Sequence, residues 1–450
     1  MSFAARKVAF EVLQAVHQDD AYSNLVLPAA ITKAKLDGRD AGFATELTYG
    51  ALRRQGSLDA VIKACSERDD IDPKVLDVLR IGAYQLLFMR VPDHAAVSET
   101  VDLARKVTST GPTKFVNAVM RKIAAHDWPT WLTKLTEGLP AIEKLAIEYS
   151  YPTWVIRVLA DSYQCDSESI KPILEAGNTP IPVSLVARPG QHEVTELLRL
   201  PNVQAGKWSP LAARIVKSDG GSTKPGDLLP VQENRVGVQD EGSQLVALGL
   251  VNAKVTSATP EEHWLDMCAG PGGKAAILAG YAPDHDSDFT AIEPTPARAK
   301  LVENSLRNAP GQHRVVIKDA REFESQYLFD RILVDAPCTG LGALRRRPEA
   351  RWRKSPTDIP ALTKLQSQLL AKAAELIKPG GVIGYATCSP HIAETDAIVN
   401  DFLKKHPDFE LQDISPALPQ LNLPVQTKTL RLNPMIHETD GMFLALLTKR

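Results

Sequence analysis

Residues 264–274 read WLDMCAGPGGK, an apolar run that leads into a glycine-rich turn, and an alanine-rich stretch follows at 275–279. A short unbroken apolar run predicts a buried strand, and the alanines after the turn predict a helix. The same order of strand, turn and helix repeats after Val238, which is typical of a doubly wound sheet. The sequence therefore predicts an α/β domain over residues 231–450.

The glycine-rich turn has the composition of a cofactor loop, because glycines let the backbone approach a ligand and expose its N–H groups. It is not a Walker loop, since Lys274 is followed by Ala275 and not by Ser or Thr. Glu293 ends the next predicted strand at an offset of about 20 residues, which suits a carboxylate that holds ribose hydroxyls. These features indicate an adenosine-type cofactor. The candidate cofactor-binding residues are Cys268, Ala269, Gly270, Pro271, Gly272, Gly273, Lys274, Glu293, Asp319 and Asp335.

Two cysteines, Cys338 and Cys388, each follow the carboxyl end of a predicted strand, 331–334 and 381–385. Ligands of open α/β sheets bind at that edge. A single cysteine is more often a small buried hydrophobe, but two at equivalent strand ends favour a nucleophilic role. The five cysteines contain no Cys-x-x-Cys pair and no metal-ligand spacing with histidine, so neither a zinc site nor a disulfide framework is expected.

Length and composition predict the number of domains and limit the kinds of partner that the chain can bind. A chain of 450 residues with 44% hydrophobic residues predicts two or three domains with real cores. The net charge of −2 means that any binding of nucleic acid must come from local basic patches. No run of eighteen apolar residues occurs, so a cytoplasmic protein that is soluble and binds no membrane is expected.

The N-terminal part has helical spacing of its apolar residues, for example at Val8 and Val12 and again at Val116, Val119 and Met120. We predict an all-α domain over residues 1–135. Residues 140–230 change character, with several prolines around a probable strand at 183–186, and are expected to form a small α+β module.

A dense basic run follows the segment that carries Cys338. Such runs are often plain solvated surface, but next to the predicted ligand-binding edge of the sheet this run favours binding of RNA phosphates, with a tryptophan available for stacking. The candidate RNA-binding residues are Arg345, Arg346, Arg347, Arg351, Trp352 and Arg353.

Four separated motifs, at 266–274, 335–340, 386–389 and 440–443, resemble those of the S-adenosylmethionine-dependent RNA cytosine-5 methyltransferases, and 238–244 fits the segment that opens their catalytic domain. The helical part, through 92–100 and 115–121, is similar to the NusB-like domain that marks the RsmB (Sun, Fmu) type. The resemblance implies a NusB-like helical domain, a middle module and a Rossmann-like methyltransferase domain. Departures from the family pattern are Glu293 where Asp is usual, Ala275 where Thr is common, and 187–189 in place of an Arg-x-Asn motif.

The resemblance also implies roles for the site. Cys388 would attack carbon 6 of the target cytosine, Cys338 would serve the release step, and Asp335 would bind the cytosine amino edge and the cofactor. Ser389 and Pro390 are expected to begin a helix whose end favours the Cys388 thiolate. The expected substrate is 16S ribosomal RNA and the expected state is a monomer. Transfer RNA remains an alternative, as do a non-catalytic NusB-like assembly factor and, on the glycine-rich turn and Glu293 alone, a nicotinamide-dependent dehydrogenase.

Overall fold

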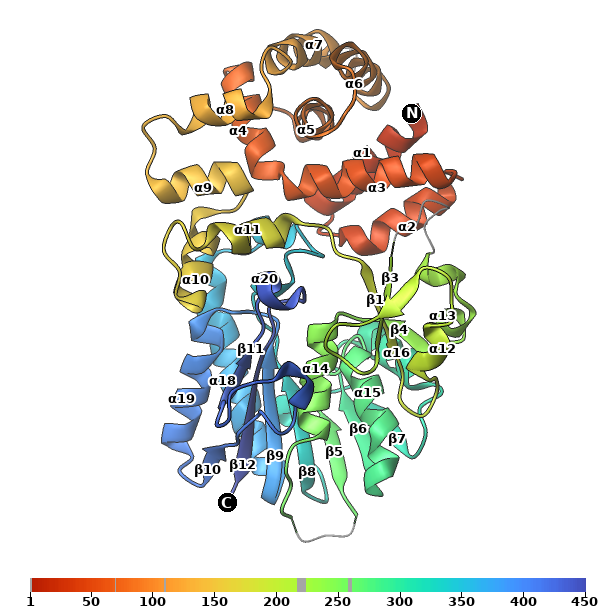
Figure 1. The fold of residues 1–450 in the computed structure, drawn as a ribbon, viewed down its shortest axis with the longest axis vertical. Helices are drawn as coiled ribbons and strands as arrows, with labels where there is room; N and C mark the ends of the chain where they lie inside the picture. Colours follow the sequence, from red (N-terminus) through yellow and green to blue (C-terminus); the bar gives the residue numbers. More distant parts are fainter. Residues whose placement is uncertain (1, 69, 109–110, 217–223, 258–260) are drawn as a thin grey trace. The chain divides into compact units, whose positions relative to one another are not determined.

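The computed structural model describes residues 2–68, 70–108, 111–216, 224–257 and 261–450. The chain forms two compact units (Figure 1). The helical unit comprises Met1–Thr179 together with Leu344–Lys354, and the sheet unit comprises Pro180–Ala343 together with Ser355–Arg450. The chain thus leaves the sheet unit after Ala343 and returns at Ser355.

The helical unit confirms that the N-terminal part of the chain is all-α. Val8 and Val12 of α1 and Val116, Val119 and Met120 of α7 are all buried in one core, as their spacing requires. Its helices are α1 (Phe3–Gln18), α2 (Ser23–Lys33), α3 (Gly38–Arg53), α4 (Gln55–Ser66), α5 (Pro73–Phe88), α6 (Asp93–Val107), α7 (Pro112–Ile123), α8 (Trp128–Thr136), α9 (Ala141–Tyr149), α10 (Thr153–Tyr163), α11 (Lys171–Asn178) and, from the later segment, α17 (Ala350–Arg353).

The residues expected to form a middle module divide between the two units. The helices α9, α10 and α11 belong to the helical unit, whereas the predicted strand at 183–186 belongs to the sheet unit. There it lies in a four-stranded antiparallel sheet of order β2-β3-β1-β4. These strands are β1 (Val183–Ala187), β2 (Val203–Ala205), β3 (Ala212–Ile215) and β4 (Val236–Val238), with the short helices α12 (Val194–Leu197) and α13 (Leu229–Gln232).

The main sheet has the strand order β10-β12-β9-β8-β5-β6-β7, and β11 pairs with β12. Strands β5 to β9 pair with one another in parallel, whereas β12 pairs antiparallel with β9. The strand order changes direction between β5 and β8, which makes that point a topological switch. The strands are β5 (His263–Asp266), β6 (Asp288–Ile292), β7 (His313–Val316), β8 (Phe329–Asp335), β9 (Ile377–Thr387), β10 (Phe409–Leu411), β11 (Thr429–Arg431) and β12 (Phe443–Lys449).

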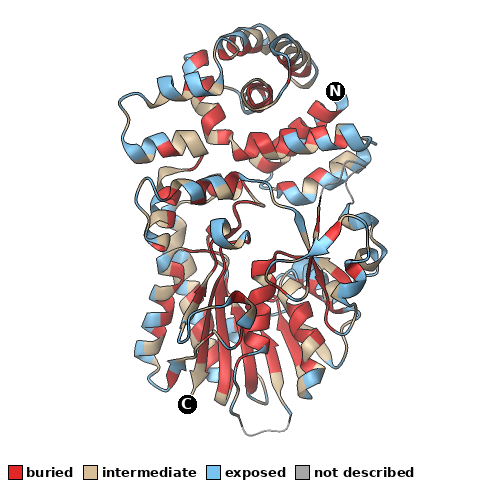
Figure 2. Cartoon of the chain, viewed as in Figure 1, coloured by how far each residue is buried: buried red, intermediate tan, exposed pale blue. Residues whose placement is uncertain are grey.

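Each face of the main sheet carries its own apolar core, as the alternation along β9 shows. Val382 and Ala386 pack in one core, and Ile383 and Tyr385 pack in the other. The first core includes residues of α14 (Glu241–Val251), α15 (Gly273–Tyr281) and α16 (Pro296–Leu306), and the second includes residues of α18 (Ile359–Leu376) and α19 (Asp396–Lys405). Strands buried on both faces explain the unbroken apolar runs of the sequence, and Figure 2 shows them as buried.

The remaining helix of the sheet unit is α20 (Pro434–His437). No helix within the described residues is long and apolar enough to cross a membrane.

Candidate active site

The two thiols that the sequence singled out meet at the carboxyl edge of the main sheet. Cys388 directly follows β9, and Cys338 comes three residues after β8. Their Sγ atoms are 3.4 Å apart, both residues are partly exposed, and both are free thiols. Because β8 and β9 are parallel neighbours, their ends lie side by side and bring the two thiols into hydrogen-bond contact.

Hydrogen bonds between loops fix this arrangement. The N–H of Gly342 donates to the carbonyl of Cys388 at 2.9 Å, and the N–H of Gly441 donates to the carbonyl of Gly342 at 2.8 Å. A Cβ at position 342 would come within 2.0 Å of the Gly441 carbonyl oxygen, so only glycine allows this close approach. The segments after β8, after β9 and before β12 are therefore held together around the thiols.

Charged groups distinguish the two thiols. The hydrogen bond with Cys338 holds the pKa of Cys388 below its ordinary value, with help from Lys274 and against burial, Asp335 and Asp440. The same hydrogen bond, burial and the charge of Glu394 raise the pKa of Cys338 well above its ordinary value. Of the two thiols, Cys388 therefore loses its proton more readily than Cys338.

Lys274 supplies the positive charge of the site. Its Nζ lies 2.7 Å from Oδ2 of Asp335, and the side chain is 12% exposed. Burial lowers the pKa of Lys274, but Asp335 and Cys388 outweigh it and raise that pKa overall. Lys274 thus stays cationic beside the carboxylate of Asp335 and the thiol of Cys388.

The expectation that a helix begins at Ser389 and Pro390 is wrong. These residues are irregular, a 3₁₀ turn follows at Ile392–Glu394, and α19 begins only at Asp396. A helix end therefore does not explain the Cys388 thiolate, which depends on Cys338 and Lys274 instead.

The glycine-rich turn is shaped by two positions that admit no side chain. Gly272 has φ of +110° at the start of α15, and a Cβ there would lie 2.6 Å from that of Ser305. A Cβ on Gly270 would lie 2.2 Å from a carboxylate oxygen of Glu293. Beneath the turn, Asp266 is 1% exposed and accepts a hydrogen bond from the N–H of Cys268. Burial, and then the charge of Asp335, raise the pKa of Asp266 to about 7.

The other two acidic candidates lie beyond β6 and β7 but already have partners. Glu293 is buried, accepts from the N–H of Thr295 at 3.0 Å and pairs with Arg298 at 3.4 Å. Asp319 binds Arg321 through both carboxylate oxygens, and this hydrogen bonding holds the pKa of Asp319 below its ordinary value. A ribose at Glu293 would therefore compete with Arg298.

Gln239 is a candidate that the sequence reasoning missed. Its side chain is buried, its Nε2 donates to Ser243, and its Oε1 has no hydrogen-bond partner within the described part of the chain. That oxygen lies 3.3 Å from the position of a Cβ on Gly273. A free acceptor beside the backbone N–H groups of a glycine-rich turn fits a small ligand that carries both a donor and an anionic group. In the sequence, the resemblance of the segment 238–244 to the start of the family's catalytic domain was the feature that could have pointed to Gln239.

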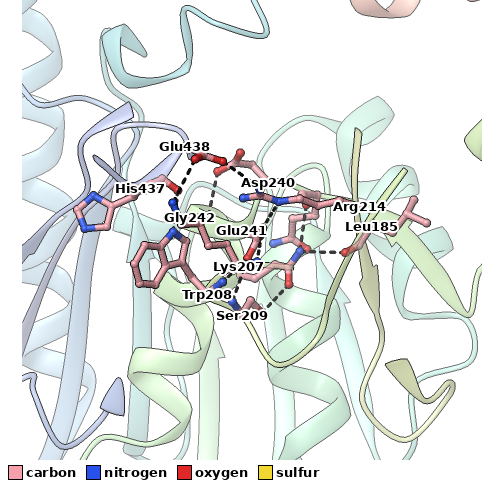
Figure 3. A network of polar contacts seen from close by, with 12 residues as sticks. Leu185, Lys207, Trp208, Ser209, Arg214, Asp240, Glu241, Gly242, His437 and Glu438 are labelled. Carbon is pink, nitrogen blue, oxygen red and sulfur yellow. Dashed lines mark hydrogen bonds and ion pairs between the residues drawn. The ribbon is translucent and has the colours of Figure 1, made fainter. Parts of the chain in front are cut away.

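A polar network around Glu241 holds the segment that follows Gln239 in place (Figure 3). The carboxylate of Glu241, which is 1% exposed, accepts from the backbone N–H groups of Lys207, Trp208 and Ser209 and from Arg214. Gln244 donates to the carbonyl of Gln239 at 3.0 Å. Fixing the loop in this way leaves the amide of Gln239 directed at the turn.

The basic run lies in the helical unit and is partly buried, which corrects the expectation of a phosphate grip at Arg351. Arg351 is 0% exposed, and its guanidinium donates to the carbonyl of Ser150 and the side chain of Asn178 and stacks 3.8 Å above the ring of Tyr151. Arg345 is also buried. A side chain without accessible surface cannot take a phosphate from RNA.

Other members of the run share this packing. The guanidinium of Arg353 donates to the carbonyls of Val16, Asp20 and Ala21, and the indole of Trp352 lies against Gly56, where it would clash with a Cβ at 2.5 Å. Arg346 and Arg347 are partly exposed. Trp352 and Arg353 are also partly exposed, so four residues of the candidate set keep accessible surface.

No group of three or more His, Cys, Asp or Glu side chains that could hold a metal ion occurs within the described ranges.

Comparisons with known proteins agree with this architecture. The family model "16S rRNA methyltransferase RsmB/F" matches residues 253–448, and the NusB family model matches residues 4–125. The chain is 45% identical to a putative methyltransferase of Mycobacterium tuberculosis over 99% of this chain and 96% of that protein. It is 31% identical to the probable ribosomal RNA small subunit methyltransferase B of Bacillus subtilis over 99% of both.

The solved structure of PH0851 shares the fold, with a TM-score of 0.77 and 23% identity, over 100% of this chain and 99% of that one. The sheet with its switch point, the helical unit and the relatives lead to one conclusion: the chain belongs to the RsmB/F family of 16S rRNA methyltransferases and contains a NusB-family domain.

Proposed function

We propose that the protein methylates carbon 5 of a cytosine in 16S ribosomal RNA, with S-adenosylmethionine as methyl donor and Cys388 as a transient covalent nucleophile. The observation that carries this proposal is the pair of thiols 3.4 Å apart, of which one has a lowered and the other a raised pKa. Carbon 5 of cytosine is too weak a nucleophile to take a methyl group directly. A thiolate that adds to the ring removes this difficulty.

In the first step, the Cys388 thiolate forms a bond to carbon 6, and the electron pair of the 5,6 double bond shifts so that carbon 5 becomes nucleophilic. Asp335, partly exposed at the end of β8, would hold the amino edge of the base. The base must leave any double helix to reach the thiol.

In the second step, once carbon 5 carries the methyl group that S-adenosylmethionine would supply, Cys338 would remove the proton from carbon 5. Its hydrogen bond to the Cys388 thiolate is the largest cause of its raised pKa, and this cause disappears once Cys388 is bonded to carbon 6. Cys338 can then lose its proton and act as the base. The electrons of the broken C–H bond restore the 5,6 double bond, and the C–S bond breaks to return Cys388 as a thiolate.

The cofactor would be held by the turn 268–274, by Glu293 and Asp319 at the next strand ends, and by the free oxygen of Gln239. The turn offers backbone N–H groups to a carboxylate, and Gln239 offers an acceptor to an ammonium group. When bound, S-adenosylmethionine supplies an electrophilic methyl group to carbon 5.

The RNA would be held through its phosphates, to which the partly exposed Arg346 and Arg347 can contribute. Relatives that align with 99% of this chain are named as small-subunit ribosomal RNA methyltransferases, which supports 16S RNA as the substrate and favours it over transfer RNA. Methylation of ribosomal RNA would take place in the cytoplasm. We also propose that the protein acts as a monomer.

The test is bisulfite sequencing of 16S ribosomal RNA and of transfer RNA from a strain that lacks the gene. One 16S cytosine should lose its methyl group and regain it when the wild-type gene is returned. The gene with Cys388→Ala should not restore it, although the purified variant should still bind S-adenosylhomocysteine in calorimetry. Loss of methylation in transfer RNA alone would support the alternative substrate, and restoration by Cys388→Ala would overturn the mechanism.

A further inference from the structure

Glu394 is a buried carboxylate that the mechanism above does not use. It ends the 3₁₀ turn at Ile392–Glu394, six residues after Cys388, and is 0% exposed. Its oxygens accept hydrogen bonds from the N–H of Thr339 at 2.8 Å and from the hydroxyl of Thr339. The amide of Gln366 donates a further hydrogen bond at 3.2 Å. The carboxylate thus binds the residue directly after Cys338.

These contacts form a directional chain that joins the neighbours of both thiols. The hydroxyl of Thr339 donates to Glu394, so its oxygen must accept from the hydroxyl of Ser389, which lies 2.9 Å away. Thr339 and Ser389, both buried, are the residues that follow Cys338 and Cys388. One carboxylate therefore sets the separation of the two loops that carry the thiols.

The same carboxylate makes the surroundings of the two thiols unequal. Cys338 faces Cys388, Glu394 and the buried Tyr385 of β9. Cys388 faces Cys338, the Lys274–Asp335 pair and Asp440. Among the described residues, the cation Lys274 lies near Cys388, whereas the anion Glu394 lies near Cys338. An anion opposes ionisation of its neighbour, so this distribution favours a thiolate at Cys388.

We propose that Glu394 is a positioning residue that locks the two thiol loops together and keeps the shared proton on Cys338, so that Cys388 is the nucleophile. The catalytic value of this role rests on the proposed function. The effect of Glu394 on the two thiols does not depend on that function. It can therefore be tested without RNA.

The test is alkylation of the full-length protein by iodoacetamide across pH 6 to 10, with mass spectrometry to assign the modified cysteine. Wild type should react at Cys388 in preference to Cys338. Glu394→Gln keeps the shape and one acceptor oxygen but removes the charge, and should lower this preference by about tenfold, a change of about one unit in relative pKa. Glu394→Asp, which keeps the charge, should retain most of the preference.

Two control variants separate the effect of the Glu394 charge from a general disturbance of the structure. Asp401→Asn removes an exposed charge on α19 that pairs with Lys405, and should leave the alkylation ratio unchanged. Gln366→Met removes one hydrogen bond to Glu394 but leaves its charge, so the ratio should again stay near the wild-type value. An unchanged ratio in Glu394→Gln, or an equal loss in Gln366→Met, would overturn the proposal. Should Glu394→Gln fail to fold, preferential alkylation of Cys338 in wild type would overturn it as well.

The alkylation experiment and the test of methylation can succeed or fail independently of each other. If the alkylation ratio behaves as described but wild type methylates no cytosine, the proposed reaction fails and the role of Glu394 in the thiol pair stands. If methylation occurs but the ratio does not change, only the role of Glu394 fails.

Discussion

Lys274 in the sheet unit, which is 12% exposed, and Arg351 in the helical unit, which is 0% exposed, are both cations with little contact with solvent, but their surroundings differ in kind. Lys274 has a carboxylate partner at 2.7 Å and the thiol of Cys388 nearby, so its neighbours are ionisable groups. Arg351 donates to a carbonyl and a side-chain amide and stacks on Tyr151. Protons can move among the partners of Lys274, whereas the groups bonded to Arg351 stay neutral. A buried charge therefore indicates chemistry when its contacts can ionise and a structural anchor when they cannot.

The sharpest test of this contrast is Lys274→Met. Without the cation, the Cys388 thiolate loses its nearest positive charge and Asp335 loses its partner, so methyl transfer should fall by about 100-fold. The melting temperature should stay within a few degrees of wild type, because Asp335 is partly exposed to water. The measurements are single-turnover methylation and the melting curve. Full activity in this variant would remove Lys274 from the reactive cluster.

The complementary change is Arg351→Ala, which should affect stability and not chemistry. It leaves the Ser150 carbonyl and the Asn178 side chain without their donor and opens a cavity beside Tyr151. We expect a loss of about 3 kcal/mol in the helical unit, seen as faster hydrogen exchange in α9 and α11. Arg346→Ala, at a partly exposed position of the same run, should leave exchange unchanged. An Arg351→Ala protein with wild-type exchange but weaker RNA affinity would restore the phosphate role.

The sequence predicted well wherever a local pattern determined the outcome. Helical spacing located α1 and α7, and unbroken apolar runs located β5, β6, β8 and β9 to within a few residues. The meeting of Cys338 and Cys388 followed from parallel strands, whose ends share one edge of the sheet.

Features that depend on contacts between distant residues could not be predicted in this way. Arg351 is buried by Ser150 and Asn178, which lie about 170 to 200 positions earlier in the chain. The helix expected at Ser389 is replaced by a turn that lets Glu394 bind Thr339. A local motif cannot distinguish an exposed arginine from a buried one, nor a helix start from a turn held by a distant loop.

A smaller effect is expected from the buried carboxylate beneath the cofactor turn. The pKa of Asp266 is raised from 3.8 to about 7, so ionisation opposes folding as the pH rises from about 4 to 7, and the loss is complete above 7. Asp266→Asn can still accept from the N–H of Cys268 but never ionises. Without cofactor, the stability gained by Asp266→Asn should be about 2 kcal/mol larger at pH 8 than at pH 5. Melting curves at both values check this, and a pH-independent gain would contradict the raised pKa.

The central claim is that Cys388 bonds to the target base and Cys338 releases it. The most direct measurement uses Cys338→Ala, incubated with a 16S RNA fragment and S-adenosylmethionine and then digested for mass spectrometry. We predict a stable protein–RNA complex whose peptide carries a methylated cytidine on Cys388, and no complex in the double variant Cys338→Ala, Cys388→Ala. An adduct on another residue, or normal release of methylated RNA by Cys338→Ala, would contradict the account.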